Sequence, residues 1–373
     1  MPKFDFTKFH SSESDNWRDL IESPNGSYPE NIYSLLDKFV YYPNETLKIL
    51  VLAYGLCPSA LSKRLPLLFL YGTSGTGKST AGKFVAKVRG KHILSSSDTF
   101  ASLRNYLDET KFIDELELNC ILVWDDLDPS VLIEQPNVFR MLKVGYDRQT
   151  QWISISSQKA GTNIRFATFS PKIISTIHPV WTLPKLSELD RRSIVVAHNK
   201  PDKEIEVLDL DSFSFYGLPI AYEEFWGNEL TCKMFLETRK RFIRKKFDWL
   251  GNDEKQLLGD LVATVAGLNY FETESKIYGW LEDYWVNHLL PIKNKSSLAF
   301  IELLQDYIKE HTMLEMKLQS FIPIDSKHLL DTAKKWSMDG KIETYVTPIT
   351  LGDYMGKLGY KLTKNGWERL NNG

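Results

Sequence analysis

The spacing of apolar residues predicts alternating helices and strands near the start of the chain. Residues 31–61 carry apolar side chains at helical spacing, and Pro43 and Pro58 divide this stretch into two helical pieces. The apolar run at 66–71 ends at a glycine and predicts a buried strand, and a helix is expected at about 78–88. This order is typical of a strand–loop–helix unit.

Further short segments extend the strand prediction. The apolar run at 120–124 ends in carboxylates, and residues 152–156 alternate between apolar and polar side chains. Segments 165–169 and 193–197 complete the set. Because short strands separated by helical or loop segments favour a parallel sheet covered on both faces, we expect an α/β fold.

The apolar pattern becomes helical after about residue 203. Helices are expected at 229–250, 253–271, 274–290, 297–310, 326–336 and 349–358. Pro291 and Asn294 predict a break between the third and fourth of these helices. Residues 359–367 predict a hairpin with an Asn-Gly turn, so the last segment resembles a winged helix with 349–358 as recognition helix.

Composition narrows the class of protein. The 373 residues are 43% hydrophobic and carry a formal net charge of −2, which excludes disorder over the whole chain. Three cysteines fit a reducing compartment, and no apolar stretch has the length of a membrane span. Since residues 1–17 lack the apolar core of a signal peptide, we expect a cytoplasmic protein without a membrane partner. Residues 1–29 are polar and are expected to form a loose arm.

A glycine-rich loop between the first strand and its helix matches the pattern G-x-x-x-x-G-K-[ST]. It consists of Gly72, Thr73, Ser74, Gly75, Thr76, Gly77, Lys78 and Ser79, with Thr80 next in the helix. Glycines let backbone amides close on phosphate oxygens, and the helix N-terminus favours the same charge. We expect Lys78 to contact the β- and γ-phosphates of ATP, and Ser79 to ligate Mg²⁺.

Two acids follow the second predicted strand. Asp125 and Asp126 come directly after the apolar run 121–124. With the glycine-rich loop upstream, Asp125 is expected to hold Mg²⁺ and Asp126 to orient or deprotonate the attacking water. The alternative is that both carboxylates only cap the end of a strand.

These motifs resemble the AAA+ class of P-loop ATPases. More narrowly, residues 67–197 are similar to the ATPase cores of helicase-like replication proteins carried by plasmids, phages and other mobile elements. The segments that carry the resemblance are 72–79, 123–126, 145–148, 169–172 and 188–194. It implies an arm and helical lead at 1–62, an AAA+ core at 63–202, a helical lid at 203–295 and a winged-helix-like domain at 296–373.

The resemblance also implies roles for further residues. Ser170 matches the polar residue at the end of the fourth core strand that contacts the γ-phosphate region, although a plain Ser-Pro turn is the alternative. Arg192, or else Arg191, matches the arginine that reaches into a neighbouring subunit's site. A surface ion pair of one of these arginines with Glu188 or Asp190 is the alternative.

Two more features bear on the expected activity. Most AAA+ motors carry Asp-Glu where this chain has Asp125-Asp126, and the shorter carboxylate would suit slow hydrolysis in a switch.

Residues 233–246 form a strongly basic amphipathic segment, which either binds phosphates or is a solvated or protein-docking helix face. Arg148 is a second candidate for contact with a neighbour or with DNA.

The sequence thus predicts an oligomeric ATPase, in a hexameric ring or a helical filament, that binds ATP and Mg²⁺ and acts on DNA. A helicase or replication initiator of a mobile element is the first expectation. The alternatives are an ATP-gated regulator or loader in transposition or defence, and a protein-remodelling ATPase without a nucleic-acid role. Other replication or transposition proteins are candidate partners.

Overall fold

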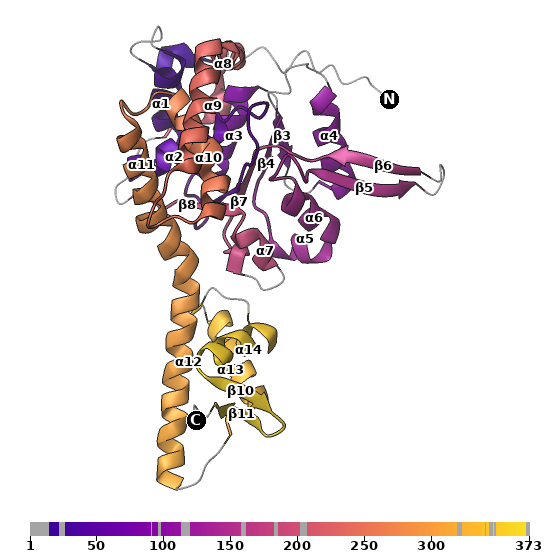
Figure 1. Ribbon diagram of the computed structural model, residues 1–373, viewed down its shortest axis with the longest axis vertical. Helices are drawn as coiled ribbons and strands as arrows, with labels where there is room; N and C mark the ends of the chain where they lie inside the picture. The colour runs from indigo at the N-terminus through magenta and orange to yellow at the C-terminus, as the bar shows by residue number, and fades with distance from the viewer. Residues whose placement is uncertain are drawn as a thin grey trace.

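The computed structural model describes residues 15–21, 27–90, 92–95, 98–112, 120–157, 162–182, 186–201, 207–318, 323–339, 341–342, 346 and 348–370. Figure 1 shows an upper body built around a sheet, from which one long helix descends to a small module that contains the C-terminal elements. Two hydrophobic cores correspond to these two parts.

A five-stranded parallel sheet lies in the upper body, which confirms the predicted α/β fold with a parallel sheet (Figure 1). Its strands are β2 (Leu67–Tyr71), β3 (His92–Ser95), β4 (Ile121–Trp124), β7 (Lys172–Thr176) and β8 (Ser193–Ala197). Their order is β3-β4-β7-β2-β8, so β2 pairs with β7 on one side and with β8 on the other. The carboxyl ends of β2, β4 and β7 therefore meet at one edge of the sheet.

Two predicted strands lie outside this sheet. β5 (Trp152–Ser157) and β6 (Thr162–Ala167) pair with each other in an antiparallel hairpin that projects sideways in Figure 1. The assignment of 152–156 and 165–169 to the parallel sheet was therefore wrong. The alternation of these segments is typical of antiparallel ribbons, whereas strands buried on both faces are apolar throughout. Ile164 is 48% exposed, as a ribbon with a solvated side allows.

Two parallel strands, β3 and β7, are absent from the sequence prediction, and β7 is the more informative because it begins and ends with polar residues. β7 starts at Lys172, whose side chain is fully buried. Its ammonium donates to the carbonyl oxygens of Gly145, Thr168 and Ser170 at 2.8, 2.8 and 2.9 Å. Three acceptors replace the water that this charge loses on burial. The strand therefore contains a lysine that an apolar pattern does not predict.

Helices surround the sheet. They are α1 (Tyr28–Phe39), α2 (Glu45–Gly55), α3 (Lys78–Arg89), α4 (Phe100–Phe112), α5 (Pro129–Glu134), α6 (Pro136–Val144) and α7 (Ser187–Asp190). The break expected at Pro43 separates α1 from α2, and α3 matches its prediction closely. α3 packs across β3, β4 and β7, which fixes the loop before it against the sheet edge.

Part of the expected loose arm is packed. β1 (Asp15–Asn16) pairs in parallel with β9 (Phe213–Ser214), and the single-turn helix Trp17–Leu20 follows it. Trp17 is only 4% exposed, and its indole nitrogen donates to the carbonyl oxygen of Tyr216 at 3.0 Å. Residues 15–20 thus join the main core, because the free energy gained by burying the large tryptophan ring exceeds the free energy lost by the polar residues around it.

The helices after residue 203 share the core of the sheet. They are α8 (Leu218–Gly227), α9 (Glu229–Arg244), α10 (Asn252–Gly267) and α11 (Glu274–Asp283). Phe235 of α9 and Leu258 of α10 belong to the same hydrophobic cluster as Phe69 of β2. The predicted boundary between 202 and 203 therefore lies within one core.

The break predicted at Pro291 and Asn294 is wrong. α11 continues through a π-helical turn at Tyr284–Leu289 directly into α12 (Leu290–Leu318). A proline lacks the amide that an α-helix needs and crowds the carbonyl four residues earlier. The wider π turn just before Pro291 relieves that conflict, so the helix runs on. The expected boundary between 295 and 296 therefore falls inside α12.

The C-terminal module has its own core. α13 (Ser326–Met338), α14 (Pro348–Lys357) and a hairpin of β10 (Tyr360–Thr363) and β11 (Gly366–Arg369) pack on the C-terminal half of α12. Ile324 adds one antiparallel bridge to Trp367. Both predicted helices and the hairpin are confirmed, but the two turn residues are Lys364 and Asn365, since Thr363 pairs with Gly366. No helix among the described residues is long and apolar enough to cross a membrane.

Candidate functional site

The glycine-rich loop joins the central strand β2 to α3. Gly77 caps α3 with a φ of +83°, a left-handed conformation that favours glycine. Gly72 lies against the chain that leaves β8, and a Cβ there would lie 2.2 Å from the carbonyl oxygen of His198. Both positions need glycine, so the loop curls closely over the first turn of the helix. Backbone amides at a helix N-terminus in this arrangement suit phosphate oxygens.

Lys78 folds back over this loop. Its side chain is largely buried, and the ammonium donates to the carbonyl oxygens of Gly72 and Thr73 at 2.8 and 2.6 Å. Burial lowers the pKa of Lys78, while the carboxylates of Asp126 and Asp125 oppose that shift. The positive charge is therefore held among the loop, α3 and the two acids.

The other residues of the loop differ in how far they are exposed to solvent. Thr76 is buried, and its hydroxyl donates to the carbonyl oxygen of Thr73 at 2.9 Å. The residues Thr73, Ser74 and Gly75 are exposed at the tip, and Thr80 is partly exposed in the first turn of α3. The tip thus offers backbone amides to solvent, while Thr76 stiffens its base.

The two acids lie where the sequence places them, at the end of β4. The Asp125 carboxylate accepts hydrogen bonds from the hydroxyl of Ser79 and, at 2.7 Å, from that of Ser175. Asp126 follows with a φ of +53° and an exposed side chain. The hydroxyl and carboxylate oxygens of Ser79 and Asp125 are the ligands that Mg²⁺ prefers, and this ion usually takes few protein ligands.

Ser170 does not lie at this site. It precedes Pro171 and β7, whereas the predicted role requires the carboxyl end of that strand. Its side chain is buried, and its hydroxyl has no hydrogen-bond partner among the described residues. The prediction took 165–169 as the parallel strand, which displaced the expected polar residue to the wrong end of β7.

Ser175 occupies the position that was expected for Ser170. It lies near the carboxyl end of β7, and its hydroxyl accepts from the backbone amide of Asp126 at 2.8 Å while it donates to Asp125. One hydroxyl thus orients both acids. The signal that could have revealed it is the sequence after Pro171, two isoleucines followed by Ser-Thr, which is a strand with a polar carboxyl end.

The two arginines lie at the opposite edge of the sheet. Arg192 directly precedes β8, and its carbonyl oxygen accepts from the amide of Leu67 at the start of β2. The parallel register pairs Leu67 with Ser193 and Tyr71 with Ala197, so the length of a strand, about 15 Å, separates Arg192 from the glycine-rich loop. Arg192 therefore cannot reach the loop of its own chain.

Arg192 is held in place within the chain. Its guanidinium donates to the carbonyl oxygen of Glu188 at 2.6 Å, approaches the Glu188 carboxylate at 3.4 Å and lies 5.2 Å from the ring centre of Tyr146. The ion pair named as the alternative is thus present. Arg191 is exposed, and both arginines line a cavity of about 300 Å³.

The cationic side chains of the basic segment at 233–246 differ in their partners and in their exposure to solvent. Arg239 turns inward to the buried carboxylate of Asp260, and Arg241 pairs with Glu274 on α11 at 2.6 Å. Lys240 and Arg244 are exposed. Arg148 is fixed by the carbonyl oxygens of Ser62 and Ser59. Every cation of the predicted basic segment except Arg239 is therefore exposed to solvent.

His198 packs beside the glycine-rich loop and was not predicted from the sequence. It is only 3% exposed, and its ring lies edge-on to Tyr42 with ring centres 5.1 Å apart. Burial lowers the pKa of His198 to about 4, with a weaker opposing effect from the Thr76 backbone, and the charge of Lys78 adds to the lowering. A single histidine after a strand gives no sequence signal for this position.

No protein-family model matches the sequence, and no curated protein matches it at a significant level. A functional conclusion therefore depends on the geometry of the site.

Proposed function

We propose that this chain is a P-loop ATPase of the AAA+ class that acts on DNA. The observation that carries the proposal is the meeting of Lys78, Ser79 and Asp125 at one edge of a parallel sheet, with the glycine-rich loop at the carboxyl end of its central strand. Ligands of open α/β sheets bind at this edge. The strand order, with β7 between β2 and β4, also suits the class.

Each residue of the site has a separate role in phosphoryl transfer. The amides of the loop and of the first turn of α3 bind the β- and γ-phosphates of ATP. Lys78 exchanges its carbonyl acceptors on Gly72 and Thr73 for phosphate oxygens. Ser79 and Asp125 would hold Mg²⁺, which neutralises phosphate charge when bound. Asp126 orients the attacking water, with its backbone fixed by Ser175.

Arg192 acts in a neighbouring copy of the chain. Its place at the far edge of the sheet prevents contact with its own loop, while Glu188 and Tyr146 hold the guanidinium beside the cavity that it lines with Arg191. A guanidinium brought to the γ-phosphate stabilises the charge of the transition state. The working form is therefore an oligomer, in a hexameric ring or a helical filament.

Two surfaces support DNA as the partner. α9 presents Lys240 and Arg244 to solvent, and the hairpin of the C-terminal module presents Lys361 and Lys364. That module has the element order of a winged helix, with α14 in the position of the recognition helix. A helicase or replication initiator of a mobile element combines these parts.

An ATP-gated regulator or loader is the second candidate, favoured by the shorter carboxylate at Asp126. The test measures ATP binding, ATP hydrolysis with and without single- and double-stranded DNA, strand displacement and the mass of the assembly. DNA-stimulated hydrolysis by an oligomer with strand displacement is expected. Slow hydrolysis without displacement favours the second candidate, and no ATP binding overturns both.

A further inference from the structure

A basic cleft lies between the helical layer and the loop that leads into β2. Its volume is about 310 Å³, and its lining includes Lys63, Arg64, Arg148, Gln149, Arg239 and Gln256. These residues come from the loop before β2, the turn after α6, α9 and α10. The glycine-rich loop lies at the other edge of the sheet, so this cleft is a second site.

The lining of the cleft selects for an anion. Four cationic side chains and two amides are accompanied by one carboxylate, that of Asp147, which Arg64 pairs with at 2.8 Å. None of the described residues that line the cleft is aromatic or aliphatic. Phosphate oxygens match the guanidinium and amide donors of this lining.

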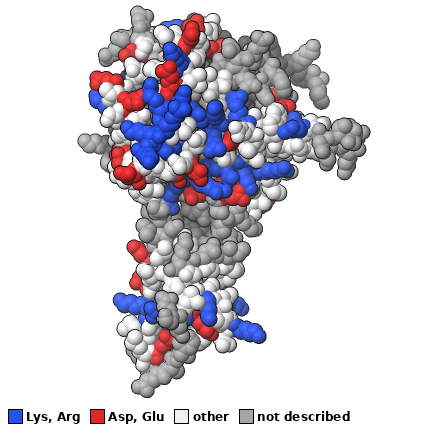
Figure 2. Space-filling model, viewed as in Figure 1, with Lys and Arg blue, Asp and Glu red and all other residues white. Residues whose placement is uncertain are grey.

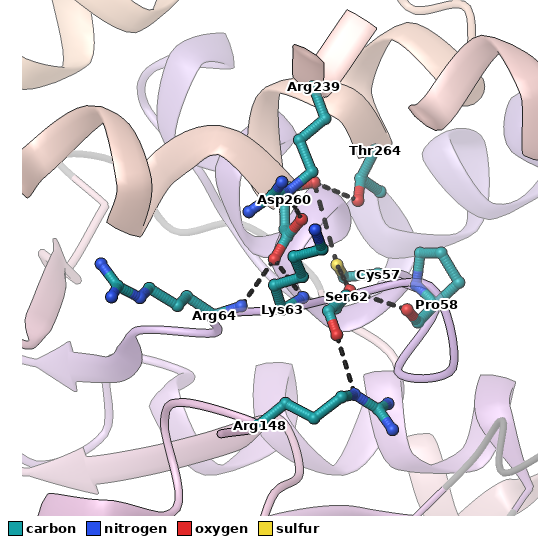
Figure 3. Close-up of polar contacts among 9 residues, drawn as sticks. All are labelled: Cys57, Pro58, Ser62, Lys63, Arg64, Arg148, Arg239, Asp260 and Thr264. Atoms are coloured by element: carbon teal, nitrogen blue, oxygen red, sulfur yellow. Dashed lines mark hydrogen bonds and ion pairs between the residues drawn. The ribbon is translucent and has the colours of Figure 1, made fainter. Parts of the chain in front are cut away.

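Buried anchors hold two walls of the cleft in position (Figure 3). The Asp260 carboxylate is fully buried, accepts from the backbone amides of Lys63 and Arg64 at 2.7 and 2.8 Å, and binds Nε of Arg239 at 2.5 Å. On the opposite side, Arg148 donates to the carbonyl oxygen of Ser62 at 3.0 Å. Groups fixed in advance lose little entropy when a ligand binds.

The positive surface extends beyond the cleft. Arg64 also lines the neighbouring cavity that contains Arg191 and Arg192, where Asp253 and Glu254 contribute the opposite charge. Lys240 follows Arg239 in α9 and is exposed. Figure 2 shows lysine and arginine side chains gathered over this part of the viewed face. An extended anion fits this surface better than a single phosphate.

We propose that the basic cleft binds the sugar–phosphate backbone of a nucleic-acid strand. The proposal rests on DNA as the partner in the proposed function and adds the place where a strand is held. Because contacts to phosphates carry no sequence information, binding there is independent of sequence. A strand in the cleft lies next to Arg64 and thus beside the cavity of Arg192.

The test measures the affinity of the full-length protein for labelled single-stranded DNA by fluorescence anisotropy, together with ATP binding and the mass of the assembly. Oligo-dT and a mixed-sequence oligonucleotide are titrated at several salt concentrations. The variants are Lys63→Ala, Lys240→Ala and the double variant. The Lys63 substitution leaves its backbone amide bonded to Asp260. Lys276→Ala on α11 is the matched control, since Lys276 is an exposed lysine that pairs with Glu272.

The double variant is expected to bind both oligonucleotides at least 10-fold more weakly. The slope of log affinity against log salt should fall by about 0.7 for each cation removed, as for single strands. The control should retain the parent affinity, and thermal melting should confirm that each variant is folded.

Other outcomes overturn the proposal in distinguishable ways. If the double variant keeps the parent affinity and slope, the cleft does not hold DNA, while the proposed function stands. If it keeps DNA affinity but loses assembly, the cleft is instead a contact between copies of the chain. If the parent binds ATP but no DNA, both the cleft proposal and the DNA partner fail, while the ATPase proposal stands.

Discussion

The hydroxyl of Ser175 donates to the carboxylate of Asp125 at 2.7 Å, across the neighbouring strands β7 and β4. The same hydroxyl accepts from the amide of Asp126 at 2.8 Å. A single serine therefore sets the orientation of both acids at the end of β4. It links the proposed metal ligand to the residue that would position water.

We expect Ser175→Ala to slow hydrolysis more than it weakens ATP binding. The variant keeps the glycine-rich loop and Lys78 but frees the Asp126 backbone, so turnover should fall by about 10-fold or more. ATP affinity should change by less than about 3-fold, as for one indirect hydrogen bond. The measurements are steady-state hydrolysis and equilibrium binding.

Ser170→Ala is the matched control for that variant. Ser170 carries a buried hydroxyl at the other end of β7, so its loss should leave turnover unchanged. If Ser170→Ala slows hydrolysis and Ser175→Ala does not, the assignment of the two serines is reversed.

Lys78→Ala should weaken ATP binding by about 100-fold or more, because the loop loses the cation that contacts the phosphates. Lys83→Ala, five residues further along the same helix, removes a lysine that is only partly buried and should bind ATP as the parent does. Equilibrium binding of a fluorescent ATP analogue measures both. Equal affinity of Lys78→Ala and the parent would mean that the loop does not bind the triphosphate.

Arg192→Ala should abolish hydrolysis in the oligomer while it leaves ATP binding intact. Because Arg192 lies a strand's length from its own loop, the proposed role requires it to act on a neighbouring copy of the chain. Mixing Arg192→Ala subunits with Asp126→Asn subunits should therefore restore some sites that contain both intact residues. Absence of recovery at every mixing ratio would count against action between subunits.

The parallel sheet could be predicted where strands are apolar throughout. The runs at 66–71 and 120–124 correspond to β2 and β4, and the motifs after them placed Lys78 and Asp125 correctly. The local sequence was sufficient there, because the apolar runs predict strands that are buried on both faces and the motifs after them predict loops at the ends of the same strands.

The prediction failed where distant contacts decide the structure. Lys172 begins a buried strand in which its ammonium donates to the carbonyl oxygen of the distant Gly145 as well as to those of Thr168 and Ser170 just upstream. Because this strand was not predicted, Ser170 was expected at the site and Ser175 was missed. Pro291 likewise lies in a continuous helix only because a π turn precedes it. Neither compensation has a signal in the local sequence.

The pair of Arg239 and Asp260 should be a major contributor to stability. Asp260 is fully buried, and Arg239→Met would leave its charge without the guanidinium partner. Burial already raises the pKa of Asp260, against the lowering effect of Arg239. The free energy of unfolding should fall by about 3–5 kcal/mol.

Lys240→Met, at the next position of α9, is the control for that variant. Its side chain is exposed, so the change should be within about 0.5 kcal/mol. Urea unfolding measures both variants. Equal effects of the two substitutions would show that the buried pair does not hold α9 and α10 to the loop before β2.

Stability should fall as the pH drops from about 6.5 to about 4, in part through His198. Its pKa is about 4 in the folded chain, because the ring is buried, and about 6.5 in an unfolded chain. Between these values the unfolded chain binds a proton that the folded chain does not, so acid favours unfolding. The contribution of His198 is therefore complete above pH 6.5 and is lost as the pH falls toward 4. Between pH 7 and pH 5, protonation of His198 in the unfolded chain should lower the free energy of unfolding by about 2 kcal/mol.

Comparison with variants isolates this histidine from the carboxylates that also titrate. His198→Phe keeps a ring against Tyr42 but cannot take up a proton, so its unfolding free energy should depend less on pH than that of the parent. His328→Gln, at an exposed position of α13, should keep the full dependence. The measurement is urea unfolding at pH 7 and pH 5. An unchanged difference between the two pH values in His198→Phe would mean that the ring beside the glycine-rich loop is accessible to protons in the folded protein, and that its burial does not contribute to acid sensitivity.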